Sequence, residues 1–312
     1  MNVRKYIAAA LIAFTAWSCS DDKDDLSPVE ILPDYALPQG DAPKEANDLI
    51  QSLYDQYGSY FLYNVTQKDF AWSLSAGSGA SVVDSIVLGK PEYTKPMLDY
   101  VHDIWLKYFS DDFLKGPGLP YRVMMVDSIK QRRAGEGWPP ERLYILSDFK
   151  IIGKGITIAG MNENLLSMSP DVKNTKKNAL LKALMDYYIQ SGIITFPQEF
   201  YEISDYTETN FPVPVGERPT DSDENMEAYR SRGFLPSGYS AFGPNEWYFG
   251  DYTWPMAKVN DQSAFMVNIL QRTDQEMAPY LEYPLIKQKF DLLVNHFKQY
   301  GIDVRAIAND RY

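Results

Sequence analysis

Apolar side chains along much of this chain recur every third or fourth residue, and this spacing predicts amphipathic helices. The predicted helices cover residues 45–62, 93–109, 171–191, 222–231, 259–272 and 284–300. Alternating or continuous apolar runs predict strands at residues 69–75, 121–128, 143–147 and 155–159. The runs at 121–128 and 143–147 indicate buried strands, and Gly192 is the expected C-cap of the helix before it. Helices at both ends with strands between them predict an α+β domain.

The N-terminus has the pattern of a secretion signal. Arg4 and Lys5 precede an apolar run at 6–16 that is too short to span a bilayer, and the small Ser18 follows. Cys19 comes next and is the only cysteine of the chain. We therefore predict a lipoprotein signal peptide at 1–18, cleaved before a lipidated Cys19. An ordinary signal peptide with an incidental cysteine remains the alternative.

An acidic run follows the cysteine, with the sequence SDDKDD at 20–25. It resembles the surface-export signal on lipoproteins of Gram-negative, glycan-degrading anaerobes, which implies the outer face of the outer membrane. A solvated acidic tether is the simpler interpretation, and both can hold together. Because residues 19–43 lack a periodic apolar pattern and contain four prolines, we expect an extended, flexible tether there. The globular domain would then occupy 44–312.

The charge and the cysteine content exclude several kinds of partner. The formal net charge is −12, and removal of Arg4 and Lys5 with the signal peptide would make it −14. Nucleic acid requires clustered Lys and Arg, so it is not an expected partner. With Cys19 lipidated, no thiol remains for a disulfide, a thiolate metal site or a cysteine nucleophile. No segment after the signal is apolar enough to cross a membrane.

Four stretches carry a resemblance to a known family. They are FPQEFYEIS at 196–204, RGFLPSGYS at 232–240, DQSAFMVN at 261–268, and the closing helix through GID at 301–303. In order and spacing they resemble the substrate-import-associated zinc metallohydrolase lipoproteins, a zinc-binding metallopeptidase family, over about residues 45–308. The resemblance implies a zincin-like scaffold, with a small sheet packed by several helices.

Members of that family carry an HExxH motif on the helix before the FPxEF-like stretch, and an acidic zinc ligand later. Two histidines at i and i+4 share one helix face and bind zinc, while the glutamate acts as general base on zinc-bound water. The resemblance places these positions at Lys182, Ala183 and Asp186, with the later ligand at Phe265. Residues 171–192 contain neither histidine nor glutamate. We therefore expect a degenerate member with no metal site, no catalytic residues and no cofactor.

Other residues offer little replacement chemistry. The two histidines, His102 and His296, lie on different predicted helices, and a lone helical histidine is more often structural than a ligand. A carboxylate pair for glycoside cleavage is joined only by the fold, so the sequence leaves it open. An aromatic stretch within 247–254 could contact a sugar, peptide or protein if exposed, although burial is the favoured interpretation. Its possible ligand-contact residues are Trp247, Tyr248, Tyr252 and Trp254.

Two functions follow from the resemblance. The favoured one is a non-catalytic accessory lipoprotein on the cell surface. Its partners would be a TonB-dependent transporter and that transporter's substrate-binding lipoprotein (SusC/SusD-like), and it would bind either the transporter or a peptide or glycan ligand. The alternative is an active zinc-dependent peptidase with an unrecognised metal site.

Overall fold

The fold was analysed in a computed structural model, which describes residues 33–71, 84–133, 137–153, 155–207, 223–236 and 257–312. The chain divides into two units, Met1–Ala36 and Leu37–Tyr312. All helices and strands discussed below belong to the second unit. The predicted signal peptide, Cys19 and the aromatic residues Trp247, Tyr248, Tyr252 and Trp254 lie outside the described residues.

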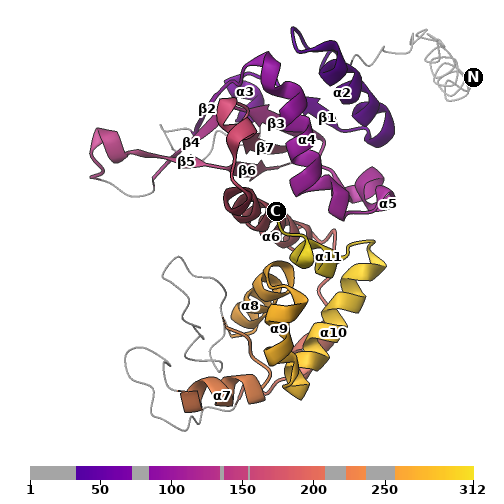
Figure 1. Cartoon of the computed structure of the whole chain (residues 1–312), viewed down its shortest axis with the longest axis vertical. Coiled ribbons are helices and arrows are strands. Elements are labelled where there is room, and N and C mark those ends of the chain that lie inside the picture. The colour runs from indigo at the N-terminus through magenta and orange to yellow at the C-terminus, as the bar shows by residue number, and fades with distance from the viewer. Residues whose placement is uncertain (1–32, 72–83, 134–136, 154, 208–222, 237–256) are drawn as a thin grey trace, which may run out of the picture. The chain divides into compact units, whose positions relative to one another are not determined.

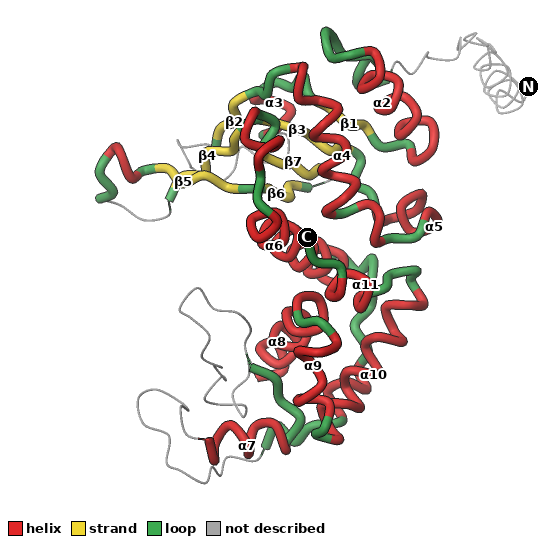
Figure 2. Tube along the Cα trace, viewed as in Figure 1, coloured by secondary structure: helices red, strands yellow, loops and turns green. Residues whose placement is uncertain are grey.

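Two small sheets form the β-structure of the described residues (Figure 1). The first contains, in spatial order, β1 (Tyr60–Leu62), β3 (Arg122–Val126), β7 (Gly155–Ala159) and β6 (Phe149–Ile152). Strands β1, β3 and β7 are parallel, and β6 is antiparallel to β7. The second sheet is antiparallel and contains β2 (Ser85–Val87), β4 (Ser128–Arg132) and β5 (Tyr144–Ser147). Figure 2 shows β4 and β5 extending away from the first sheet as a two-stranded arm.

Helices precede, interrupt and follow the strands, so the α+β prediction is confirmed. The longer ones are α2 (Lys44–Tyr57), α4 (Thr94–Ile104), α6 (Pro170–Gln190), α7 (Asp223–Ser231), α8 (Ala257–Gln271), α9 (Asp274–Leu281) and α10 (Pro284–Gln299). Shorter α-helices are α3 (Gln67–Phe70), α5 (Asp111–Phe113) and α11 (Val304–Asn309). Among the helices of the described ranges, none has the length and apolar character of a membrane span.

Local chemistry explains where two of the sequence predictions were wrong. The helix predicted over 45–62 ends at Tyr57, because Gly58 adopts a left-handed φ of 69° and caps the helix. Residues 60–62 then form β1 in place of a further helical turn. The strand predicted over 69–75 begins inside a helix, because Thr66 and Asp69 form a capping box that starts α3.

The longest helix of the described part, α6, connects the first sheet with the C-terminal helices (Figure 1). Ser169 caps it by accepting a hydrogen bond from Val172 N, and Pro170 occupies its first position. Its buried face carries Lys177, Leu180, Leu181, Leu184, Met185 and Tyr188. This face packs in the single large core, and α6 contacts both α4 and α8. The helix stops before Gly192, whose φ of 73° confirms the predicted C-cap region.

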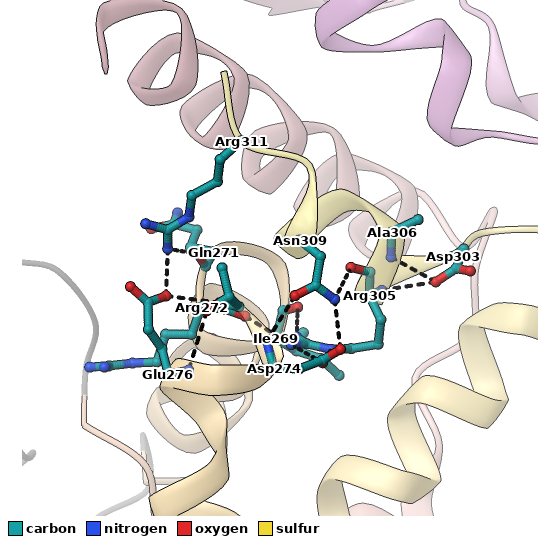
Figure 3. Close-up of polar contacts among 11 residues, drawn as sticks. Ile269, Gln271, Arg272, Asp274, Glu276, Asp303, Arg305, Ala306, Asn309 and Arg311 are labelled. Carbon is teal, nitrogen blue, oxygen red and sulfur yellow. Dashed lines mark hydrogen bonds and ion pairs between the residues drawn. The ribbon is translucent and has the colours of Figure 1, made fainter. Parts of the chain in front are cut away.

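A polar network fixes the C-terminal helix α11 to the α8–α9 junction (Figure 3). Arg305 donates to the backbone oxygen of Ile269 at 2.7 Å and to the Asp274 carboxylate at 2.7 Å. Asn309 donates to the same carboxylate at 2.8 Å. These charge-assisted bonds satisfy backbone groups at the end of α8. They therefore hold the helix that carries residues 261–268 in place.

Candidate functional site

Two of the three motif positions on α6 form an ion pair on one helix face. Lys182 Nζ lies 2.6 Å from Asp186 Oδ2, and these side chains are 21% and 35% exposed. The i, i+4 spacing that would present two imidazoles to zinc here presents an ammonium and a carboxylate to each other. Ala183 stands at the position that the resemblance assigns to the general base. The structure thus pairs the two residues that the family pattern would assign to the metal.

Phe265 lies on α8, the helix that packs against α6. Its side chain is fully buried and meets the Phe200 ring edge to face, with 5.0 Å between the ring centroids. A phenyl ring offers no lone pair to a metal ion. The position that the resemblance assigns to the later ligand is therefore part of the core.

No other described residues rebuild a zinc site. His102, on α4, is 63% exposed and lies 3.7 Å from the carboxylate of its neighbour Asp103. His296, on α10, has its Nε2 2.6 Å from the backbone oxygen of Thr195. Within the described ranges, no three His, Cys, Asp or Glu side chains converge as metal ligands. Zinc requires a converging set of nitrogen, sulfur or carboxylate donors, so the side chains at the assigned positions do not fit it.

A different polar site lies in the interior beside Phe265. Lys289 on α10 and Asp261 on α8 form an ion pair of 2.6 Å, and both side chains are 0% exposed. Tyr206 donates its hydroxyl to the same carboxylate oxygen, Asp261 Oδ2, at 2.5 Å. Lys289 also donates to the backbone oxygen of Gly233 at 3.1 Å. We refer to these four residues as the buried ion-pair site.

Aromatic rings surround the ammonium group of this site. Lys289 Nζ lies 4.7 Å from the centroid of Phe200, 4.9 Å from that of Phe234 and 5.3 Å from that of Phe265. Ring faces attract a cation, and the effect is stronger when water is excluded. Burial raises the pKa of Asp261, although Lys289 and Tyr206 act in the opposite direction. Burial likewise lowers the pKa of Lys289, against the attraction of Asp261.

The buried ion-pair site and the three phenyl rings around its ammonium group bring together all four stretches that carry the family resemblance. Residues 196–204 contribute Phe200, residues 232–240 contribute Gly233 and Phe234, and residues 261–268 contribute Asp261 and Phe265. The fourth stretch is the closing helix α10, which contributes Lys289. These stretches therefore form a packing centre of the C-terminal half. Since its charged groups are enclosed, the site's role is to position helices.

The sequence contained a signal for this site that the helix pattern alone did not resolve. Lys289 stands three residues after Ile286 and four before Leu293, both of which are fully buried. A lysine at that spacing lies on the apolar face of its helix and requires a buried partner. Asp261 begins one of the four resemblance stretches. It lies far from Lys289 along the chain, so the sequence pattern did not predict that the two residues pair.

The chain has a distant structural neighbour among known proteins. No protein-family model matches the sequence, and no curated protein matches it. A solved structure described as a putative zinc-binding metallo-peptidase from Bacteroides caccae is similar, with a TM-score of 0.44 and 12% sequence identity. The alignment covers 86% of this chain and 91% of that chain. A likeness this slight does not bear on chemistry, and the α+β assignment rests on the strands and helices described above.

Proposed function

We propose that this chain is a non-catalytic accessory lipoprotein on the outer face of the outer membrane, with a metallopeptidase-like fold. It would serve a TonB-dependent nutrient importer by binding the transporter, its substrate-binding lipoprotein or a peptide or glycan ligand. The location at the outer membrane is supported by the predicted lipoprotein signal ending at Cys19 and by the acidic run at 20–25. The non-catalytic character is supported by the residues at the motif positions.

One observation carries the non-catalytic part of the proposal. The Lys182 ammonium lies 2.6 Å from Asp186, where the family pattern requires two neutral imidazoles. A cation would have to enter beside an existing positive charge and compete with it for the single carboxylate. Catalysis also requires a general base. Ala183 does not meet this requirement, because its side chain cannot take a proton from water.

Zinc titration of the full chain tests this part. We expect no stoichiometric zinc binding to chelator-treated protein in isothermal titration calorimetry. The triple variant K182H/A183E/D186H should bind zinc more tightly than the unaltered chain but only weakly, because it restores two imidazoles at i and i+4 on α6 while Phe265 still supplies no third ligand. Lys44 and Asp48 form the same i, i+4 pair on the exposed face of α2, so K44H/D48H measures what an isolated helical histidine pair binds. Tight zinc binding by the unaltered chain, or chelator-sensitive peptide cleavage by it, would favour the peptidase alternative.

The anchor and the partner are tested in native membranes. The unaltered chain should fractionate with the outer membrane and co-purify with a TonB-dependent transporter after mild detergent extraction. The variant Cys19→Ala should lose the lipid and appear in the soluble fraction, because acyl chains supply the membrane affinity, about 0.8 kcal/mol per buried methylene. Recovery of the lipidated protein as an unattached monomer would contradict the accessory role.

A further inference from the structure

Strand β5 is the most exposed apolar segment of the two sheets. The sequence pattern predicted a buried strand here, and that prediction was wrong: Tyr144 is 41% exposed, Ile145 39% and Leu146 74%. The strand lies at the end of the order β2-β4-β5, so within the described residues it pairs on one side only. It has no proline or charged side chain, the usual protections of an edge strand.

The ladder with β4 determines which backbone groups face outward. Arg133 N donates to Leu143 O at 2.9 Å, and the register pairs Arg132 with Tyr144 and Lys130 with Leu146. Antiparallel pairs alternate between hydrogen-bonded and non-hydrogen-bonded. The N–H and C=O groups of Tyr144 and Leu146 therefore point away from β4. They form an open edge that can bind another extended chain.

The side chains next to this edge combine apolar and positive groups on one face. Cross-strand partners share a face, so Leu146 lies beside Lys130 and Tyr144 beside Arg132. Residues 128–147 contain four basic and two acidic side chains, whereas the whole chain has a net charge of −12. The arm is thus a locally basic part of an acidic protein, and its electrostatic complement is an acidic segment.

Leu146 also lines an open cleft of about 700 Å³ at the base of the arm. Leu165, Met168 and Val172 add apolar surface to the cleft. Lys176 and Asp148, which both line the cleft, form an ion pair, so their charges offset each other. The cleft can therefore take an apolar side chain from a strand that lies along β5.

We propose that β5 is a docking edge for an extended, acidic segment of a partner protein. The segment adds as a strand beside Tyr144 and Leu146, places its carboxylates near Lys130 and Arg132, and inserts an apolar side chain into the cleft. A second copy of this chain is a poorer occupant. Pairing β5 with β5 would bring two locally basic arms together, and the like charges of the two arms repel each other.

Fluorescence anisotropy with a defined peptide tests the proposal. The probe is a labelled dodecapeptide with the repeat Glu-Thr-Val-Thr, which places Glu and Val alternately on one face of a strand. It is titrated with the full chain, and its counterpart has Lys in place of Glu. We expect the acidic peptide to bind and the basic one not to bind, with affinity falling as salt rises. The variant K130E/R132E should weaken binding about tenfold, because these residues lie one strand beyond β5 from the segment and reversing both charges turns their attraction for it into repulsion. Lys298→Glu, an exposed lysine on α10, changes charge away from β5 and should have no comparable effect.

Two substitutions at one residue separate backbone pairing from side-chain contact. Leu146→Ala removes only the side chain, whereas Leu146→Pro also removes an outward N–H while leaving the bonds to β4. We expect the proline variant to bind more weakly than the alanine variant, with circular dichroism showing that both are folded.

The proposal is overturned if neither peptide binds, if both bind equally, or if Leu146→Pro binds as well as Leu146→Ala. Concentration-dependent dimers that K130E/R132E strengthens would assign the edge to a second copy. These measurements do not involve α6 or Cys19, so they can fail independently of the zinc and membrane tests.

Discussion

Replacing Lys289 with Met is expected to lower the free energy of unfolding by about 3–5 kcal/mol, the usual loss when one partner of a buried ion pair is removed. The substitution keeps the length of the side chain, so little packing is lost. It leaves the enclosed Asp261 carboxylate with Tyr206 as a hydrogen-bond donor but without the Lys289 ammonium group. The Gly233 carbonyl also loses its Lys289 donor. Urea unfolding followed by circular dichroism measures the change.

The pH dependence of this loss of stability is a second, independent test of the role of the Asp261 charge. Burial raises the pKa of Asp261 above its value in the unfolded chain, and removal of Lys289 raises it further. A carboxyl group with a raised pKa in the folded state is tolerated below its unfolded pKa and destabilises the fold as pH rises through the folded pKa. The loss in Lys289→Met should therefore be smaller at pH 5 than at pH 8.

The double variant D261L/K289M is the matched control. Because neither charge remains, most of the stability should return, with a residual cost for Tyr206 and Gly233, whose polar groups lose a partner. A single Lys289→Met variant as stable as the unaltered chain, at both pH values, would show that the pair contributes nothing to the fold. A double variant less stable than the single one would show that packing, and not charge, is the source of the loss.

The parts of the fold that the sequence predicted well are the long helices. Helices α6, α8 and α10 lie within two residues of their predicted bounds. Each is long enough for several repeats of the apolar spacing, so one misleading residue does not change the result. The short elements gave less signal. Three-residue strands such as β1 and β2 contain no full repeat, and pairing with distant strands defines them.

Two errors have the same physical origin. Residues 67–70 contain an apolar side chain that suited a strand, but the capping box of Thr66 and Asp69 decided the local structure. The apolar run in β5 indicated burial, yet a run of this kind fits an exposed edge strand as well. A pattern of apolar residues states which side chains avoid water. It does not state whether the molecule itself or another chain covers them.

The candidate site shows a related limit of sequence reasoning. The stretches of the family resemblance predicted where zinc ligands would stand, and they meet in space at the ion pair of Lys289 and Asp261. The phenyl rings that these stretches place around the pair, Phe200, Phe234 and Phe265, are fully buried, so packing constrains them. Lys182 and Asp186 on α6 form a separate, half-buried ion pair that shares no residue with the buried ion-pair site. A resemblance of this kind supports a fold better than it supports a reaction.

Gly233→Ala is the second substitution for which we expect a large effect, about 2–5 kcal/mol of lost stability. Gly233 has a φ of 85°, a conformation that costs an alanine about 1–2 kcal/mol. An added Cβ would also stand 2.7 Å from Ser204 Oγ and 2.9 Å from Leu285 Cβ. Overpacking of that degree typically adds about 1–3 kcal/mol. The displaced backbone carries the carbonyl that accepts from Lys289, so the strain reaches the buried ion-pair site.

Gly192→Ala separates backbone strain from the close contact. Gly192 has a comparable φ of 73°, and an added Cβ there would meet no atom within 4 Å. It should therefore lose only the conformational part, about 1–2 kcal/mol.

In the Gly233→Ala background, Ser204→Ala removes the nearest obstructing atom and should recover part of the loss. Measured against Ser204→Ala alone, this forms a double-mutant cycle whose coupling reports the contact. Equal losses at the two glycines, with no coupling to Ser204, would mean that only the left-handed backbone matters. The tight packing around Gly233 would then have no role in holding residues 232–236 against α10.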